Sequence, residues 1–253
     1  MTPRKDAQLV LLRHGESEWN KRNLFTGWRD VKLTPRGEAE AREAGRLMKA
    51  EGFKFDIAFT SLQTRAIKTL WLALEEMDQM WIAEQKHWRL NERHYGALQG
   101  TDKKEAVERF GAEQVHQWRR SYDVRPPQVD LASSDYPKFD PRYADLADDE
   151  LPRGECLKDV LARVLPYWDD VIVPVLKAGR TVLVAAHGNS LRALLKHLEG
   201  VSDADIPEVN LPTGVPKVYH LNDRMKADNA YFLGDQAELE KRIAAVKAQT
   251  GKS

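Results

Sequence analysis

The chain has 253 residues, more than one typical domain of roughly 150 but within the reach of a single α/β unit. Lysine and arginine total 39, as do aspartate and glutamate, so the net charge is zero. This balance argues against a general nucleic-acid or membrane-surface binder, since both usually carry a basic excess. The single cysteine, Cys156, excludes an internal disulfide and a thiolate metal cluster within one chain.

Three short apolar runs predict strands, at residues 9–12, 57–60 and 181–186. Their hydrophobicity is continuous rather than alternating, which suits strands buried on both faces of a parallel sheet. The first run follows a charged N-terminal stretch and is too short for a signal-peptide core or a membrane span. We therefore expect a reduced, cytoplasmic protein.

Helical patterns lie between these strands and predict an α/β layered fold. Thr34 and Pro35 fit the start of a helix that ends near Gly52, and Asp102 fits the cap of another that stops at Gly111. A strong apolar stripe begins at Leu157, in a helix that Pro166 and Pro174 are expected to bend or break, and a further helix is expected after Ser190, ending near Gly200.

The segment from about 111 to 152 breaks this rhythm. It has little periodicity, contains five of the twelve prolines, and is rich in aromatic residues. Loops longer than about 12–15 residues in a compact domain are usually functional or disordered. Because this one is too aromatic for a simple linker, we expect an inserted lid or subdomain.

Polar and charged residues gather where the predicted strands end. Arg13, His14 and Gly15 follow the first strand, Ser61 and Arg65 the second, and His187, Gly188 and Asn189 the third, while Glu92, Arg93 and Tyr95 follow a possible short strand. In open α/β sheets, ligands bind beyond the carboxyl ends of the strands. Each residue alone could be a structural histidine or a solvated charge, so only the constellation points to a site.

The chemistry of this set favours a phosphoryl group over a metal ion. His14, His187 and Glu92 could in principle bind a metal, but the neighbouring arginine would repel a divalent cation, and no H-x-x-x-H or H-E-x-x-H spacing is present. Guanidinium groups bind phosphate oxygens bidentately, and a neutral imidazole can attack phosphorus to form a covalent intermediate. The sequence contains neither a G-x-S-x-G elbow nor a G-x-x-x-x-G-K-[ST] loop.

The run "LLRHGESEWN" resembles the signature of the histidine phosphatase superfamily, and the longer "RHGESEWNKRNLFTGWRDVKLTPRGEAEA" resembles its cofactor-dependent phosphoglycerate mutases. The runs "TSLQTRAIKTLW", "RLNERHYGALQG", "WRRSYDVRPP", "AAHGNSLRALLKHLEG" and "NLPTGVP" match the same family in order, from about residue 8 to 235. The resemblance implies a three-layer α/β/α fold with a mostly parallel central sheet. It implies one domain over residues 1–253, with 111–152 as the inserted lid and 236–253 as a mobile C-terminal tail.

The resemblance also implies a role for each matching residue. His14 would be the nucleophile that becomes phosphohistidine, Glu92 the acid and base that exchanges protons with the substrate hydroxyl. The groups that would hold the transferring phosphoryl group are Arg13, Arg65, His187, Asn20 and the amide of Gly188. The residues that would bind the rest of the substrate are Ser17, Thr26, Gly27, Tyr95, Lys103, Arg119, Arg120 and Asn189.

These roles imply an enzyme that interconverts 3-phosphoglycerate and 2-phosphoglycerate in glycolysis and gluconeogenesis. It would be primed by 2,3-bisphosphoglycerate and would need no metal, and it would form a homo-oligomer without nucleic-acid or membrane partners. Bisphosphoglycerate synthase or phosphatase activity is the enzymatic alternative, and a silent anion-binding protein is the alternative from another class. The chain departs from the family pattern at Arg125, at Cys156 in "ECL", and at Lys217, His220 and Asn222.

Overall fold

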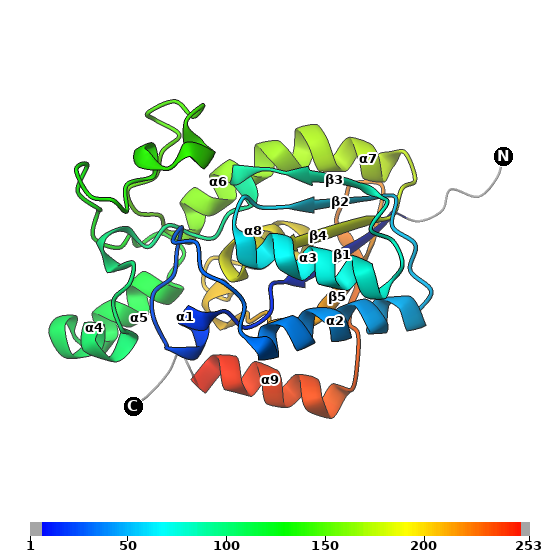
Figure 1. Ribbon diagram of the computed structural model, residues 1–253, viewed down its shortest axis with the longest axis horizontal. Coiled ribbons are helices and arrows are strands. Elements are labelled where there is room, and N and C mark those ends of the chain that lie inside the picture. Colours follow the sequence, from blue (N-terminus) through cyan, green and yellow to red (C-terminus); the bar gives the residue numbers. More distant parts are fainter. Residues whose placement is uncertain (1–6, 249–253) are drawn as a thin grey trace.

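Strand β1 (Ala7–Arg13) lies inside a six-stranded sheet in the computed structural model, which describes residues 7–248 (Figure 1). The strand order is β3-β2-β4-β1-β5-β6. β1, β2, β3 and β4 run parallel, while at one edge β5 pairs antiparallel with β1 and β6 pairs antiparallel with β5. The strands are β2 (Ile57–Thr60), β3 (Ala83–Lys86), β4 (Val182–Ala186), β5 (Pro216–Leu221) and β6 (Ala227–Phe232). The sheet is therefore mostly parallel, as expected.

The register of the parallel strands brings their carboxyl ends together. Arg13 pairs with Ala186, and Thr60 pairs with Ala185, so β1, β2 and β4 all stop at the same level. The backbone N–H of His14 continues the ladder by donating to the carbonyl of Ala186 at 3.0 Å. The residues that follow the three strands therefore meet at one edge of the sheet.

Helices cover both faces of the sheet, so that the fold has three layers (Figure 1). On one face Leu9 and Leu11 pack with Phe59 and Val184 against α6 and α8, and on the other Val10 and Leu12 pack against α2 and α3. This alternation explains the continuous apolar runs, because every side chain of β2 and β4 is buried. The helices are α1 (Glu18–Lys21), α2 (Pro35–Ala50), α3 (Thr64–Glu76), α4 (Lys103–Phe110), α5 (Ala112–Arg120), α6 (Leu157–Tyr167), α7 (Val173–Lys177), α8 (Gly188–Glu199) and α9 (Gln236–Ala248).

The predicted helix ends are mostly confirmed. The Thr34 hydroxyl accepts from the N–H of Gly37 at 3.0 Å, Asp102 caps α4, and Gly200 ends α8 in the left-handed conformation. The start predicted for the helix after Ser190 was wrong, because this helix, α8, begins at Gly188, shortly after β4. Ser190 instead belongs to its first turn, where its hydroxyl accepts from the N–H of His187 at 3.2 Å.

The effect expected of Pro166 and Pro174 takes the form of a widened turn rather than a break. Pro166 lies within α6, and residues 168–172 form a π-helical turn that leads into α7. A proline ring lacks the N–H that an α-helix needs and crowds the carbonyl four residues before it, which for Pro174 lies in this wider turn. Pro174 lies in the first turn of α7, where a missing N–H costs little.

The segment 111–152 is more ordered than its sequence suggests. Residues 112–120 form helix α5, which the weak periodicity had not predicted, and the following stretch contains short 3₁₀ turns. Its aromatic residues Tyr136 and Tyr143 pack with Trp28 and Trp88 in a buried cluster. Figure 1 shows α4, α5 and this segment together at one end of the sheet.

The C-terminal tail predicted over 236–253 begins as a helix. α9 runs from Gln236 to Ala248, below α2 in Figure 1, and residues 249–253 lie outside the described residues. The mobility of the tail stays a prediction. Within residues 7–248, no helix has the length and apolar character needed to cross a membrane.

Candidate active site

The loop after β1 presents His14 to a pocket at the carboxyl edge of the sheet. Its Nδ1 lies 2.7 Å from the carbonyl oxygen of Gly15, which can only accept, so Nδ1 carries the proton and Nε2 keeps its lone pair. Burial, together with the guanidinium groups of Arg65 and Arg13, holds the pKa of His14 well below 6.5. The imidazole is therefore neutral and nucleophilic at physiological pH.

Gly15 is required by the close approach of two backbone segments. A Cβ atom at this position would lie 2.1 Å from the carbonyl oxygen of Gly37, which is far inside van der Waals contact. The N–H of Gly15 donates to the Thr69 hydroxyl at 3.1 Å. Gly15 therefore permits a close backbone approach that fixes the loop carrying His14.

His187 lies directly against His14, with ring centroids 5.1 Å apart in an edge-to-face arrangement. Its Nε2 is hydrogen-bonded to the Ser61 hydroxyl at 2.7 Å, and its buried Nδ1 has no hydrogen-bond partner among the described residues. Burial and the charge of Arg65 also hold the pKa of His187 well below 6.5. A buried ring nitrogen without a partner is costly, and an anion bound beside His14 could supply the missing partner.

Arg13 and Arg65 flank His14 with largely buried guanidinium groups. Arg65 is anchored through the carbonyl oxygens of Arg29 (3.0 Å) and Gly27 (2.9 Å), and Arg13 through that of Leu211 (2.7 Å). Burial lowers the pKa of Arg65 to about 10, and the buried Nε of Arg13 has no hydrogen-bond partner within residues 7–248. Both groups remain charged at neutral pH and offer donors to an anion beside His14.

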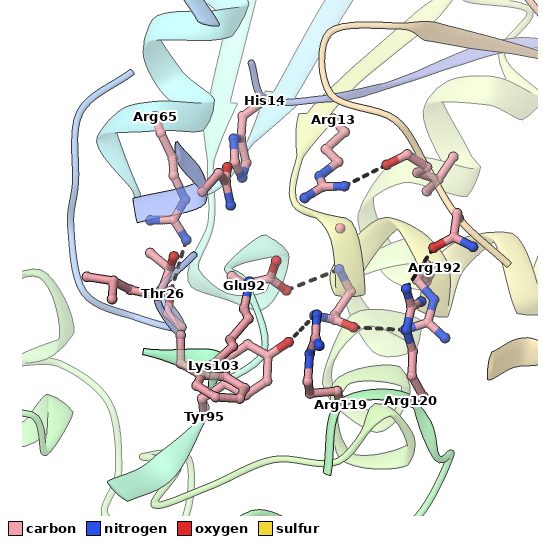
Figure 2. A pocket seen from close by; sticks show the side chains of 18 residues that line it. Arg13, His14, Thr26, Arg65, Glu92, Tyr95, Lys103, Arg119, Arg120 and Arg192 are labelled. Atoms are coloured by element: carbon pink, nitrogen blue, oxygen red, sulfur yellow. Dashed lines mark hydrogen bonds between the residues drawn. The ribbon is translucent and has the colours of Figure 1, made fainter. Parts of the chain in front are cut away.

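Glu92 is the one carboxylate among the described residues that line the pocket. Its Oε1 accepts from the N–H groups of Arg93 (2.7 Å) and Asn189 (3.1 Å), the latter in the first turn of α8. Figure 2 shows Glu92 between the His14 side of the pocket and the opposite wall. A carboxyl group placed in this way can give a proton to, or take one from, an oxygen bound between the two walls.

The opposite wall carries a second group of cations. It consists of Lys103, Arg119, Arg120 and Arg192 (Figure 2). Burial and Arg119 lower the pKa of Lys103 to about 7, and burial and Arg120 lower that of Arg192 to about 9. The depressed values reflect crowded positive charge that a bound anion would relieve. The pocket therefore presents two cationic regions, one at each wall.

Most of the predicted site residues lie together in this pocket. Those that line it are Arg13, His14, Asn20, Thr26, Gly27, Arg65, Glu92, Tyr95, Lys103, Arg119, Arg120, Gly188 and Asn189. His187 lies behind His14 and is fully buried rather than part of the lining. The strand-end argument thus identified the position of the site, and the resemblance supplied its far wall.

Ser17 is placed differently from the prediction. It is fully buried, does not line the pocket, and caps α1, where its hydroxyl accepts from the N–H of Asn20 at 3.1 Å. The Asn20 side chain accepts from the N–H of Ser17 in return, at 3.1 Å. Ser17 therefore orients Asn20, which does line the pocket. The short strand expected before Glu92 is β3 (Ala83–Lys86), and a 3₁₀ turn at Trp88–Leu90 separates it from Glu92.

The prediction missed Arg192 and Asn210. Arg192 donates to the Asn189 side chain at 3.0 Å, and Asn210 accepts from Arg120 at 2.9 Å. Arg192 comes three residues after Asn189 in α8, so helical spacing could have placed both on one face. Asn210 begins the run "NLPTGVP", which matches the family pattern but whose residues the resemblance did not assign to the site. Leu24, Phe25 and Leu211 complete the lining.

The sequence matches the profile of the histidine phosphatase superfamily (branch 1) over residues 9–135 and 130–226. These ranges include every predicted site residue. The chain belongs to this superfamily. Its members' fold and phosphoryl-transfer chemistry agree with a pocket that presents a neutral histidine between arginine side chains.

Solved structures of three other proteins share the fold at low identity. A mycobacterial glucosyl-3-phosphoglycerate phosphatase has a TM-score of 0.68 and 19% identity, over 89% of this chain and 97% of that one. An alpha-ribazole phosphatase from Shigella flexneri has a TM-score of 0.66 and 20% identity, over 87% and 93%. YhfR from Bacillus stearothermophilus has the same TM-score, identity and coverage. The superfamily fold therefore extends over nearly the whole chain.

The described residues contain no group of three or more His, Cys, Asp or Glu side chains arranged to hold a metal ion. The pocket residues of this chain instead supply nitrogen donors for an anion: two guanidinium groups beside His14 and four cationic groups opposite. What the arrangement can do chemically is bind a phosphorylated anion, accept its phosphoryl group on an imidazole, and exchange a proton through Glu92.

Proposed function

We propose that the protein interconverts 3-phosphoglycerate and 2-phosphoglycerate through a phosphohistidine at His14. The observation that carries the proposal is the division of the pocket cations between two walls. A phosphoglycerate has two anionic groups, and the Arg13 and Arg65 pair could take the phosphate while Lys103, Arg119 and their neighbours take the carboxylate. A substrate whose only anionic group is a phosphate would leave the second wall without a counterion.

In the proposed reaction, the Nε2 of His14 attacks a phosphorus of bound 2,3-bisphosphoglycerate. The new N–P bond forms as the bond to the ester oxygen breaks, and that oxygen takes a proton from the Glu92 carboxyl. The hydroxyl of a bound 3-phosphoglycerate then returns a proton to Glu92, and its oxygen takes the phosphoryl group from His14 as the N–P bond breaks. The bisphosphoglycerate so formed turns in the pocket and gives its other phosphoryl group to His14, which releases 2-phosphoglycerate. Arg13, Arg65 and the unpartnered Nδ1 of His187 would hold the phosphoryl oxygens throughout.

The priming group in this proposal is 2,3-bisphosphoglycerate, which supplies the first phosphoryl group. The chain's own residues fit such a polyanion, since six cationic side chains and one carboxylate line the pocket. Burial, and after it the charge of Arg119, lowers the pKa of Lys103 to about 7 and that of Arg120 to about 10. A polyanion would reverse that repulsion.

A phosphatase is the second candidate, and the structural neighbours favour it. One of them is a phosphatase of glucosyl-3-phosphoglycerate, described in complexes with VO3 and with inorganic phosphate. Transfer to water instead of a second hydroxyl would use the same His14, Arg13, Arg65 and Glu92. The difference between the two functions is what accepts the phosphoryl group from His14.

The deciding experiment follows both products from 3-phosphoglycerate in the presence of 2,3-bisphosphoglycerate. We expect 2-phosphoglycerate to form faster than inorganic phosphate by at least about 100-fold, and activity to persist in EDTA. Phosphate release that equals or exceeds isomerisation would establish the phosphatase instead. A catalytically silent protein would show neither product.

A further inference from the structure

Arg163 lies in α6, behind the loop that carries Glu92, and does not line the pocket. Its side chain is only 7% exposed, yet each of its guanidinium nitrogens is hydrogen-bonded. Nη2 donates to the carbonyl oxygens of Asn91 at 3.0 Å and of Glu92 at 2.9 Å. Nη1 donates to the carbonyl oxygen of Arg89 at 2.6 Å. One buried side chain thus holds three carbonyl groups within four residues.

Glu155 orients this guanidinium group. Its Oε1 accepts from the Nε of Arg163 at 2.7 Å, and its Oε2 accepts from Nη2 at 3.1 Å, in a two-point contact. The same carboxylate accepts from the N–H of His94 at 2.8 Å, and the N–H of Glu155 donates to the His94 carbonyl at 2.8 Å. The ion pair therefore forms hydrogen bonds to the backbone on both sides of Glu92.

Two further contacts fix the peptide groups of Glu92 itself. The indole N–H of Trp28 donates to the Glu92 carbonyl at 2.6 Å, and the Gln63 side chain accepts from the Glu92 N–H at 2.8 Å. With Arg163, the Glu92 backbone makes three directed contacts to buried side chains. Stability alone is a weak reason for such an arrangement, because a buried ion pair is often no better than an apolar replacement.

We infer that Arg163, oriented by Glu155, is a positioning residue that sets the Glu92 carboxyl for proton transfer. The inference rests on the proposed role of Glu92. A small displacement of a proton donor costs much of its effect, so loosening the backbone should slow the steps that need a proton. It should spare steps in which the leaving oxygen needs none. Dependence on the leaving group therefore separates positioning from a general loss of structure.

The test measures how fast His14 becomes phosphorylated by two donors, in single-turnover rapid-quench reactions. With 2,3-bisphosphoglycerate the leaving oxygen is an alkoxide and needs the proton. With p-nitrophenyl phosphate it is a stabilised phenolate and does not. For Arg163→Lys and Glu155→Gln we expect a roughly 10- to 100-fold loss with the first donor, part of the about 10²–10⁴-fold that acid–base catalysis supplies, and little change with the second.

Two further variants keep the test decisive. Trp28→Phe removes a different contact to the same Glu92 carbonyl and leaves the buried ion pair intact, so it replaces any Arg163 or Glu155 variant that does not fold. Tyr219→Phe removes the hydrogen bond from Tyr219 in β5 to Glu199 at the end of α8 (2.6 Å), and neither residue lines the pocket. This control should leave the rates with both donors unchanged.

Equal losses with the two donors in Arg163→Lys, Glu155→Gln and Trp28→Phe would overturn the inference. Glu92→Gln distinguishes this outcome from failure of the proposed function. If Glu92→Gln slows only the alkyl donor while the positioning variants slow both or neither, Glu92 is the proton donor and the inference is wrong. If Glu92→Gln itself shows no preference between donors, the proposed role of Glu92 falls and the inference falls with it.

Discussion

His14 is the residue on which the proposed chemistry depends, and its protonation should set the acid limit of the reaction. Burial and the charges of Arg65 and Arg13 hold its pKa well below 6.5. Since protonation removes the lone pair on Nε2, the nucleophile is lost only when the pH falls through that lowered value. We expect the rate of phosphoenzyme formation from p-nitrophenyl phosphate to stay constant down to well below pH 6.5. A half-loss at pH 6.5 or above would contradict the neutral histidine.

Lys103 sets a limit at the other side of neutrality. Its pKa is lowered to about 7, so the ammonium group is present below pH 7 and is lost as the pH rises through that value. The affinity for an inhibitor with two anionic groups should therefore weaken between pH 7 and 9. The measurement is the inhibition constant of 2-phosphoglycolate across that range. In Lys103→Gln the inhibition constant should be larger at pH 6 and should no longer rise between pH 7 and 9. A pH profile identical to that of the wild type would show that Lys103 does not titrate at the site.

Arg192 extends the second cationic wall and orients Asn189 through a 3.0 Å hydrogen bond. Its Nε is buried without a partner among the described residues. For Arg192→Met we expect the KM for 3-phosphoglycerate to rise about tenfold, the loss of one charge-assisted contact. The KM for p-nitrophenyl phosphate, which has no second anionic group, should change little. Equal changes in the two constants would place Arg192 outside substrate recognition.

Helix α5 shows how an element brings a second wall to the site. It carries Arg119 and Arg120, and its one buried apolar side chain, Val115, packs with Phe25 and Leu98. Val115→Ala should lower the free energy of unfolding by roughly 1–3 kcal/mol through the cavity it leaves. It should also raise KM severalfold while kcat changes little.

Urea denaturation and steady-state kinetics check this expectation. Val173→Ala in α7 is the matched control, since Val173 is also buried but its helix contributes nothing to the pocket. The control should lose stability to a similar degree and keep its KM. An unchanged KM in Val115→Ala would mean that α5 does not depend on this contact for its position.

The elements also explain what the sequence could and could not predict. β2 and β4 are buried at every residue, so their apolar runs identify them directly. β3 and β6 are edge strands in which no residue is buried, and α5 buries only Val115 and Arg120. Neither the helical nor the strand periodicity of apolar residues therefore marks these elements. Hydrophobic pattern reports burial, and elements that bury little are invisible to it.

For the site, the strand-end residues His14, Arg65 and His187 could be placed because parallel strands finish at one edge. Tertiary partners could not. That Arg163 reaches the Glu92 loop from α6 depends on packing across 71 to 72 residues of chain. No local pattern encodes such a pairing.

At the scale of the whole molecule, the sheet and the segment 111–152 divide the work. The sheet supplies the nucleophile and its guanidinium partners at one edge, and the segment's helix α5 supplies cations opposite them. The aromatic cluster of Trp28, Trp88, Tyr136 and Tyr143 joins the two parts beside Glu92. A pocket bounded by both parts in this way suits the proposed reaction, in which the phosphoryl group would be kept from water between two transfers.

The measurement that tests the central claim most directly follows a labelled phosphoryl group. The protein is incubated with ³²P-labelled 2,3-bisphosphoglycerate, and the acid-labile, alkali-stable label on the chain is counted before and after addition of unlabelled 3-phosphoglycerate. We predict up to one label per chain, on His14, which then moves to bisphosphoglycerate rather than to inorganic phosphate. Labelling that persists in His14→Ala, or isomerisation by the wild type without any labelled protein, would contradict it.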